Sequence, residues 1–128
     1  MKLTYSVESF PTADQAPFFT AYLEGRLIIS GENNQVIFDE SGILLVELKN
    51  AIRQWLTNKD VEGGFVYESM DFEGVVLSFM VKDDRVIEFK SDLSEFSTEI
   101  GGSGKDLIDV LTEYCESLQA FIFSSARH

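Results

Sequence analysis

Hydrophobic and polar residues alternate along much of the first third of the chain, which is the period of a β-strand with one buried face. Residues 2–8 follow this pattern, and so does the segment 19–30. Residues 31–34 then supply the glycine and asparagines of a turn, before another short apolar run at 36–38. The pattern predicts an opening strand followed by a hairpin of two more strands.

The period changes to three and four residues between 41 and 56, where leucine, isoleucine and tryptophan recur on one side of a helix. Asp39, Glu40 and Ser41 stand just before these apolar positions. A short oxygen-bearing side chain can cap the free amide groups of a helix, and negative charge suits its first turn. We therefore expect an amphipathic helix with a polar cap, ending before the glycines at 63–64.

Strand-like alternation returns in the second half of the chain. Residues 65–67, 75–81 and 86–90 each form a run of alternating or apolar residues. Residues 96–100 allow one further short strand, although Leu93 falls out of step with it. Three strands, with a fourth after them, are predicted from this stretch.

A second helix is predicted to close the chain. Ser103 is followed three residues later by Asp106, which resembles a capping box. Apolar residues then recur at helical spacing through residue 122, and acidic residues fall largely on the opposite side. One side of this helix should pack on the sheet, and the other should be acidic.

These elements follow the order β-β-β-α-β-β-β-(β)-α, in which short hairpins leave no room for repeated βαβ crossovers. The order predicts an α+β fold: one antiparallel sheet of about six to seven strands with two helices packed on it. The chain has 128 residues, 45% of them hydrophobic, and eleven phenylalanines. That supply is enough for one core, so residues 1–128 are expected to form a single domain.

Composition adds a large excess of negative charge. There are 22 acidic and 10 basic residues, which gives a formal net charge of -12. Such a chain repels nucleic acid and anionic lipid and attracts basic surfaces, so neither nucleic acid nor membrane is expected as a partner. The chain also lacks a signal-like or membrane-spanning apolar run, and its lone cysteine cannot form an internal disulfide. A cytoplasmic location follows as the expectation.

The residues that most enzymes use are scarce. His128 is the sole histidine, and Cys115 falls on the apolar side of the last helix, where a thiol serves as a small hydrophobic group. The segment Gly101–Lys105 resembles a phosphate loop, but Asp106 follows the lysine where the motif needs Ser or Thr, and the glycine spacing is wrong. We expect no enzymatic activity, no cofactor and no metal site.

The negative charge is concentrated in the second half of the chain. Residues 1–64 hold nine acidic and five basic residues, whereas residues 65–128 hold thirteen and five. Three explanations fit this distribution: a solvated surface that keeps the chain soluble, a face that binds a basic partner, or a carboxylate active site. The third explanation needs two acids that converge in a cleft.

Four segments together resemble the small acidic α+β immunity proteins with which bacteria neutralise their own contact-dependent or polymorphic toxins. They are the tryptophan-bearing helix 44–56, the strand Gly64-Phe65-Val66-Tyr67-Glu68-Ser69, the turn Met70-Asp71-Phe72-Glu73, and the strand 75–79. The resemblance implies a non-enzymatic inhibitor that masks the active site of a toxin. It does not identify the residues that do so.

The leading hypothesis is therefore an acidic surface that mimics nucleic-acid phosphates and blocks a basic toxin domain, most simply a nuclease. The alternative is a housekeeping module that binds a small ligand or forms a homo-oligomer through an exposed strand. We expect a face of carboxylates with two aromatic anchors. The predicted partner-binding residues are Glu68, Asp71, Glu73, Asp83, Asp84, Asp92, Glu95 and Glu99, with Tyr67 and Phe72 as anchors.

Overall fold

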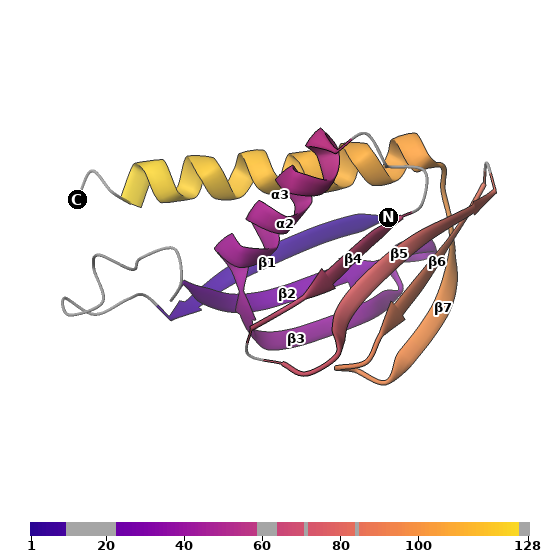
Figure 1. Ribbon diagram of the computed structural model, residues 1–128, viewed down its shortest axis with the longest axis horizontal. Helices are drawn as coiled ribbons and strands as arrows, with labels where there is room; N and C mark the ends of the chain where they lie inside the picture. The colour runs from indigo at the N-terminus through magenta and orange to yellow at the C-terminus, as the bar shows by residue number, and fades with distance from the viewer. Residues whose placement is uncertain (10–22, 59–63, 71, 84, 126–128) are drawn as a thin grey trace.

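The first three strands form an antiparallel sheet in the order β1-β2-β3 (Figure 1). The computed structural model describes residues 1–9, 23–58, 64–70, 72–83 and 85–125. Within it, β1 is Lys2–Ser9, β2 is Glu24–Ser30 and β3 is Val36–Leu44. A short 3-10 turn, η2 (Glu32–Asn34), joins β2 to β3 and confirms the predicted hairpin.

The remaining strands form a second antiparallel sheet, in the order β4-β5-β6-β7. The chain crosses it strand by strand, so each connection is a hairpin. The bounds are Phe65–Glu68 for β4, Val75–Asp83 for β5, Val86–Ser91 for β6 and Phe96–Gly101 for β7. The fourth strand, which the sequence only allowed, is therefore present as β7.

Seven strands and two helices in the described part of the chain, in this order, confirm the α+β class. The prediction of one continuous sheet is wrong, because the strands divide into sheets of three and four. The two sheets meet through side chains instead: Phe38 of β3 and Phe89 of β6 pack edge to face, with ring centroids 6.0 Å apart. This packing buries apolar side chains of both sheets between them, which stabilises the fold.

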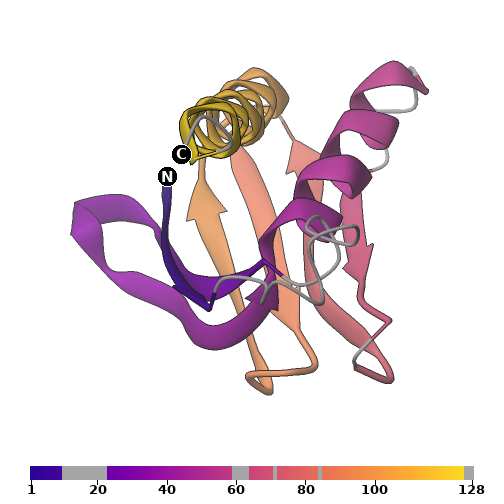
Figure 2. The ribbon, with the colours of Figure 1, turned by 90° about the vertical axis from the view of Figure 1, so that its left-hand side faces the viewer.

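Both helices lie on the same side of the sheets (Figure 2). They are α2 (Leu45–Thr57) and α3 (Gly104–Ser125), and α3 runs alongside β1. Tyr114 joins them, because its hydroxyl donates to the carbonyl oxygen of Leu45 at 2.8 Å. No helix in the described part of the chain is long and apolar enough to cross a membrane.

The start of α2 differs from the prediction. Asp39, Glu40 and Ser41 do not cap the helix, because all three lie in β3, which continues to Leu44. The helix then begins without a side-chain cap. Its first amide, that of Leu45, donates instead to the carbonyl oxygen of Leu23 at 3.1 Å. Backbone of a neighbouring segment thus satisfies a donor that a cap would otherwise take.

The cap of α3 is confirmed. The amide of Asp106 donates to the Ser103 hydroxyl at 3.2 Å, and the amide of Ser103 donates to the Asp106 carboxylate at 2.9 Å. These hydrogen bonds from Ser103 also lower the pKa of Asp106. The reciprocal pair fixes where the long helix begins.

Replacing Ser103 with alanine is expected to lower the free energy of unfolding by about 1 kcal/mol, because the Asp106 amide loses its acceptor. Urea titration followed by the fluorescence of the single tryptophan, Trp55, measures the change. Ser97→Ala is the control, since Ser97 is exposed in β7 and begins no helix. Equal losses in the two variants would contradict the capping role.

The buried residues of both sheets and both helices form one hydrophobic core. Trp55 packs on it beside Phe65, with ring centroids 5.5 Å apart, as expected from its place on the apolar side of the predicted helix. Cys115 is buried there too, and burial raises the pKa of its thiol. A thiol that is harder to ionise is a poor nucleophile, which supports the structural role predicted for it.

One lysine is buried between the helices. The Nζ atom of Lys49 donates to Gln119 at 2.7 Å, and burial lowers the pKa of the ammonium group. Lys49→Met keeps the aliphatic stem and removes the buried charge, so we expect equal or higher stability at pH 7.

Because the folded pKa of Lys49 lies below its ordinary value of 10.5, the penalty on the charged form is present at neutral pH and disappears as the pH rises. The stability gap between Lys49→Met and the parent should therefore narrow towards pH 10.5. Unfolding titrations at several pH values test this sign. A gap that widens with pH would contradict it.

Candidate functional site

Two turns meet at one end of the four-stranded sheet. The β4–β5 and β6–β7 connections lie there, and a reciprocal pair of hydrogen bonds joins them. The amide of Val75 donates to the Asp92 carboxylate at 2.9 Å, and the amide of Asp92 donates to the carbonyl oxygen of Val75 at 2.9 Å. Gly74 has a φ of 125° beside Asp92, a backbone conformation that favours glycine. The two turns therefore form one fixed surface.

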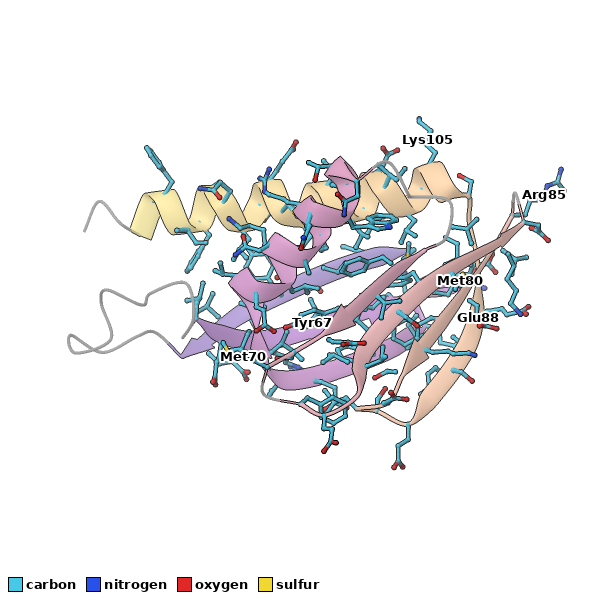
Figure 3. The ribbon with its side chains drawn as sticks, viewed as in Figure 1. Tyr67, Met70, Met80, Arg85, Glu88 and Lys105 are labelled. Atoms are coloured by element: carbon cyan, nitrogen blue, oxygen red, sulfur yellow. The ribbon has the colours of Figure 1, made fainter. Side chains whose placement is uncertain are left out.

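Helix α2 contributes a carboxylate to the same end. The Tyr67 hydroxyl donates to Glu47 Oε1 at 2.6 Å, and the amide of Met70 lies 3.5 Å from Glu47 Oε2. Figure 3 shows Tyr67 and Met70 together at this end of β4, with Met70 on the surface. Glu47 thus ties the helix to the strand and to the turn that follows it.

A small pocket of about 130 Å³ opens between these turns and the end of β3. It is far smaller than the roughly 300–1,000 Å³ of most small-molecule sites. One side chain of a partner would fill it. Its lining residues are Ser41, Gly42, Ile43, Leu44, Tyr67, Ser69, Phe72, Val76 and Leu93.

Four of the predicted carboxylates lie at the same end of the sheet as this pocket, and we call them the acidic end: Glu68, Glu73, Asp92 and Glu95. All four are exposed. They come from the end of β4 and from the two joined turns. The sequence holds no lysine or arginine at 61–81 or 91–104, so no basic residue of these segments offsets the charge.

Two other predicted carboxylates lie elsewhere, so the eight acids do not form a single face. Asp83 is at the far end of β5, about 25 Å from the start of that strand at 3.3 Å per residue, and it accepts a hydrogen bond from the amide of Arg85 at 2.7 Å. Figure 3 shows Arg85 at this end of the sheet, away from Tyr67 and Met70. Glu99 is on the outer face of the sheet, 3.9 Å from Lys82 Nζ. Both have basic neighbours.

The outer face around Glu99 carries balanced charge. Glu88 lies 2.8 Å from Lys82 Nζ and 3.3 Å from Lys90 Nζ. The hydrogen bonds of Lys82 and then Lys90 lower the pKa of Glu88, and Glu88 in turn raises the pKa of Lys82. Exposed pairs of this kind contribute little to stability, and they leave the face without a strong attraction for cations.

Tyr67 corrects the predicted pair of aromatic anchors. Its side chain is 1% exposed and forms part of the core, so it does not project from the surface as an anchor and contributes only to the wall of the pocket. Phe72 is half-buried, packs against the core and lines the pocket, so it remains a candidate. Asp71 and Asp84 lie outside the described residues.

Three contributors to this end were missed in the sequence. Glu47 lies in α2, 20 residues before Tyr67, and no local pattern connects the two. Met70, which is 70% exposed, and Leu93, which lines the pocket, were not selected. Leu93 did leave a signal, because it falls out of the alternating register where the chain turns between β6 and β7.

The described residues offer little for catalysis. No group of three or more histidine, cysteine or acidic side chains among them could hold a metal ion. The described carboxyl groups with a displaced pKa are Asp39, Glu88 and Asp106, and all three are lowered by hydrogen-bonding partners. A general acid needs the opposite shift. The exposed carboxylates of the acidic end are suited to attracting positive charge, and the small pocket opens at the same end of the sheet.

Comparison with known proteins gives a family and no activity. No curated protein and no solved structure matches the chain. A family model described as a domain of unknown function, DUF7878, matches residues 1–124, which is nearly the whole chain. By this match, the chain belongs to the DUF7878 family.

Proposed function

We propose that this chain is a non-enzymatic binding protein of the immunity class, which neutralises a basic toxin domain by covering its active site with the acidic end. One observation carries the proposal: the fold brings exposed carboxylates from the β4–β5 and β6–β7 connections to the same end of the four-stranded sheet as a small pocket. The sequence segments that form those turns contain no basic residue to offset them. The resemblance to immunity proteins supplies the class of partner.

The pocket supports a partner that is a protein. At about 130 Å³ it is the size of one inserted side chain, and Phe72 and Leu93 give it apolar walls. Interfaces between proteins are commonly held by a few anchors of this kind, surrounded by polar residues that exclude water. An apolar residue of the toxin would enter the pocket while basic residues around it meet the carboxylates.

Charge would act mainly on the rate of association. Opposite potentials steer two proteins together and can raise the association rate constant by orders of magnitude at low salt. Binding to a basic domain should therefore weaken as the salt concentration rises, because salt screens exposed charges. A nuclease fits this description, since its active site is built to hold phosphates.

The proposal predicts that the neighbouring gene encodes a protein with a toxic C-terminal domain, and the decisive experiment uses that domain as the probe. Glu68→Lys/Glu73→Lys reverses two exposed charges at the acidic end. Asp109→Lys/Glu116→Lys reverses two exposed charges on α3 and raises the net charge by the same amount. We expect the first pair to weaken binding about tenfold or more and to abolish rescue of growth, and the second pair to preserve both.

Either of two results would overturn the proposal. If both double variants weaken binding equally, overall charge acts and the acidic end is not the binding surface. If the neighbouring gene encodes no toxic domain that the chain binds, the immunity class is wrong. Calorimetry at several salt concentrations and a growth assay separate these cases.

A further inference from the structure

In the three-stranded sheet, β1 is an edge strand that pairs with β2, and no other described strand pairs with its outer side. Alternate residues of an edge strand direct their N–H and C=O groups away from the sheet, where another strand can pair with them. The edge is therefore a ready site for a further strand.

A groove of about 480 Å³ follows this edge and is walled on its other side by α3. The first seven residues of the chain all line it, over roughly 20 Å at 3.3 Å per residue. A compact ligand would meet only part of such a length. The α3 residues of the wall are Val110, Glu113, Tyr114, Ser117 and Phe121.

The side chains of β1 alternate strictly between the two faces of the strand. Leu3, Tyr5 and Val7 are half-buried, whereas Lys2 and Glu8 are exposed on the other face. Tyr5 is held by α3: its ring packs edge to face on Tyr114 at 5.6 Å, and its hydroxyl is 3.2 Å from Ser117 Oγ. The floor of the groove is thus ordered before any partner arrives.

We propose that the occupant of this edge is β1 of a second copy of the chain, paired antiparallel about a two-fold axis at Tyr5. This register places Lys2 opposite Glu8 of the other copy, and Glu8 opposite Lys2. Leu3 then faces Val7 of the other copy, so apolar residues also meet apolar residues. The two three-stranded sheets become one six-stranded sheet.

Self-complementarity is the argument for a second copy. The strand carries one basic and one acidic residue, and a two-fold axis at its centre brings them together twice. In this register each odd-numbered residue lies opposite an odd-numbered residue, and each even-numbered residue opposite an even-numbered one. The N–H and C=O groups that point away from β2 in one copy therefore meet the equivalent groups of the other copy. Ser41 already orients one charge, because its hydroxyl donates to Glu8 Oε2 at 3.1 Å.

Sedimentation equilibrium of the full chain, without a tag on the N-terminus, tests the dimer. We expect a dimer in the parent, and a dissociation constant about tenfold higher in Lys2→Glu and in Glu8→Lys, because each substitution places like charges opposite each other at two points. Lys105→Glu and Glu116→Lys are the matched controls on exposed positions of α3, and they should dissociate like the parent.

Two combinations isolate the pairing itself. Mixing the Lys2→Glu chain with the Glu8→Lys chain restores opposite charges at both points, so a heterodimer should form from two weakened partners. Placing both substitutions in one chain restores the homodimer for the same reason. Amides of residues 2–8 should exchange with solvent more slowly as protein concentration rises.

Several outcomes would overturn the proposed dimer. If the unsubstituted protein stays monomeric at about 1 mM, the proposed dimer is ruled out, because a dissociation constant above this concentration corresponds to negligible pairing. If substitutions at Lys2 and Glu8 change the dissociation constant no more than those at Lys105 and Glu116, the interface lies elsewhere. Trp55 fluorescence confirms folding of every variant, and the measurement needs no toxin, so this result is independent of the proposed function.

Discussion

Replacing Phe89 with alanine is expected to lower the free energy of unfolding by about 3–5 kcal/mol, the range measured for large aromatic residues removed from cores. Phe89 has no exposed surface and lies between Phe38 of the other sheet and Phe79 of its own, at ring distances of 6.0 and 5.3 Å. Its loss opens a cavity where the two sheets meet. Urea unfolding followed by Trp55 fluorescence measures the effect.

Phe123→Ala is the matched control, because Phe123 is 59% exposed near the end of α3. Its removal should change the stability by less than about 1 kcal/mol, as most exposed substitutions do. Similar losses for Phe89→Ala and Phe123→Ala would mean that contact between the sheets adds little. The split of the strands into two sheets would then lack its main physical cause.

Gly25→Ala is the second large effect, with an expected loss of about 2–3 kcal/mol from overpacking. A Cβ atom on Gly25 would lie 2.3 Å from the carbonyl oxygen of Ser6 in β1 and 2.7 Å from Leu45 Cδ1 at the start of α2. The first neighbour is backbone and cannot turn aside. The strand pairing of β1 with β2 must loosen to make room.

Gly31→Ala provides the comparison for Gly25→Ala. A Cβ atom on Gly31 comes no closer than 3.6 Å to its neighbours, which is ordinary van der Waals contact. Its substitution should change stability little. Thermal unfolding of both variants, together with amide exchange across β1, measures the difference. If Gly25→Ala left β1 fully protected, the close approach of these strands would not be a constraint.

Local patterns in the sequence predicted local structure well. The apolar alternation before residue 31 corresponds to β2, where Leu27 and Ile29 have no exposed surface. Ser103 and Asp106 predicted the start of α3 because a capping box depends only on residues three positions apart. Period and capping are properties of neighbouring residues, so they can be recognised without the fold.

Features that depend on distant contacts were not predictable in the same way. The split into two sheets rests on packing such as Phe38 on Phe89, which no local pattern specifies. The start of α2 rests on the carbonyl oxygen of Leu23, whereas the nearby polar residues Asp39 to Ser41 suggested a cap. In both cases tertiary contacts took precedence over local preference.

The candidate site was predictable in part. Tyr67 shares a strand face with Phe65, since they are two residues apart, so its burial follows from the alternation of β4. Its residue type, which is common at interfaces, suggests an anchor, but its position in the alternation of β4 predicts burial. The position of Asp83 was also predictable, because successive hairpin turns lie at opposite ends of a sheet and Asp83 ends β5, at the turn that follows it. The order of strands alone separates it from Glu68 and Glu73.

The direct passage from β3 into α2 has a further consequence for the unfolded chain. Because a strand and a helix meet without a loop, Ile43, Leu44, Leu45 and Val46 are all buried in succession. When the chain is unfolded, these residues are exposed together as a short apolar segment. Such a segment can pair with the same segment of other molecules and start aggregation. Glu40 and Glu47 flank the segment, and charges in these positions act as gatekeepers that keep newly made or partly unfolded chains apart.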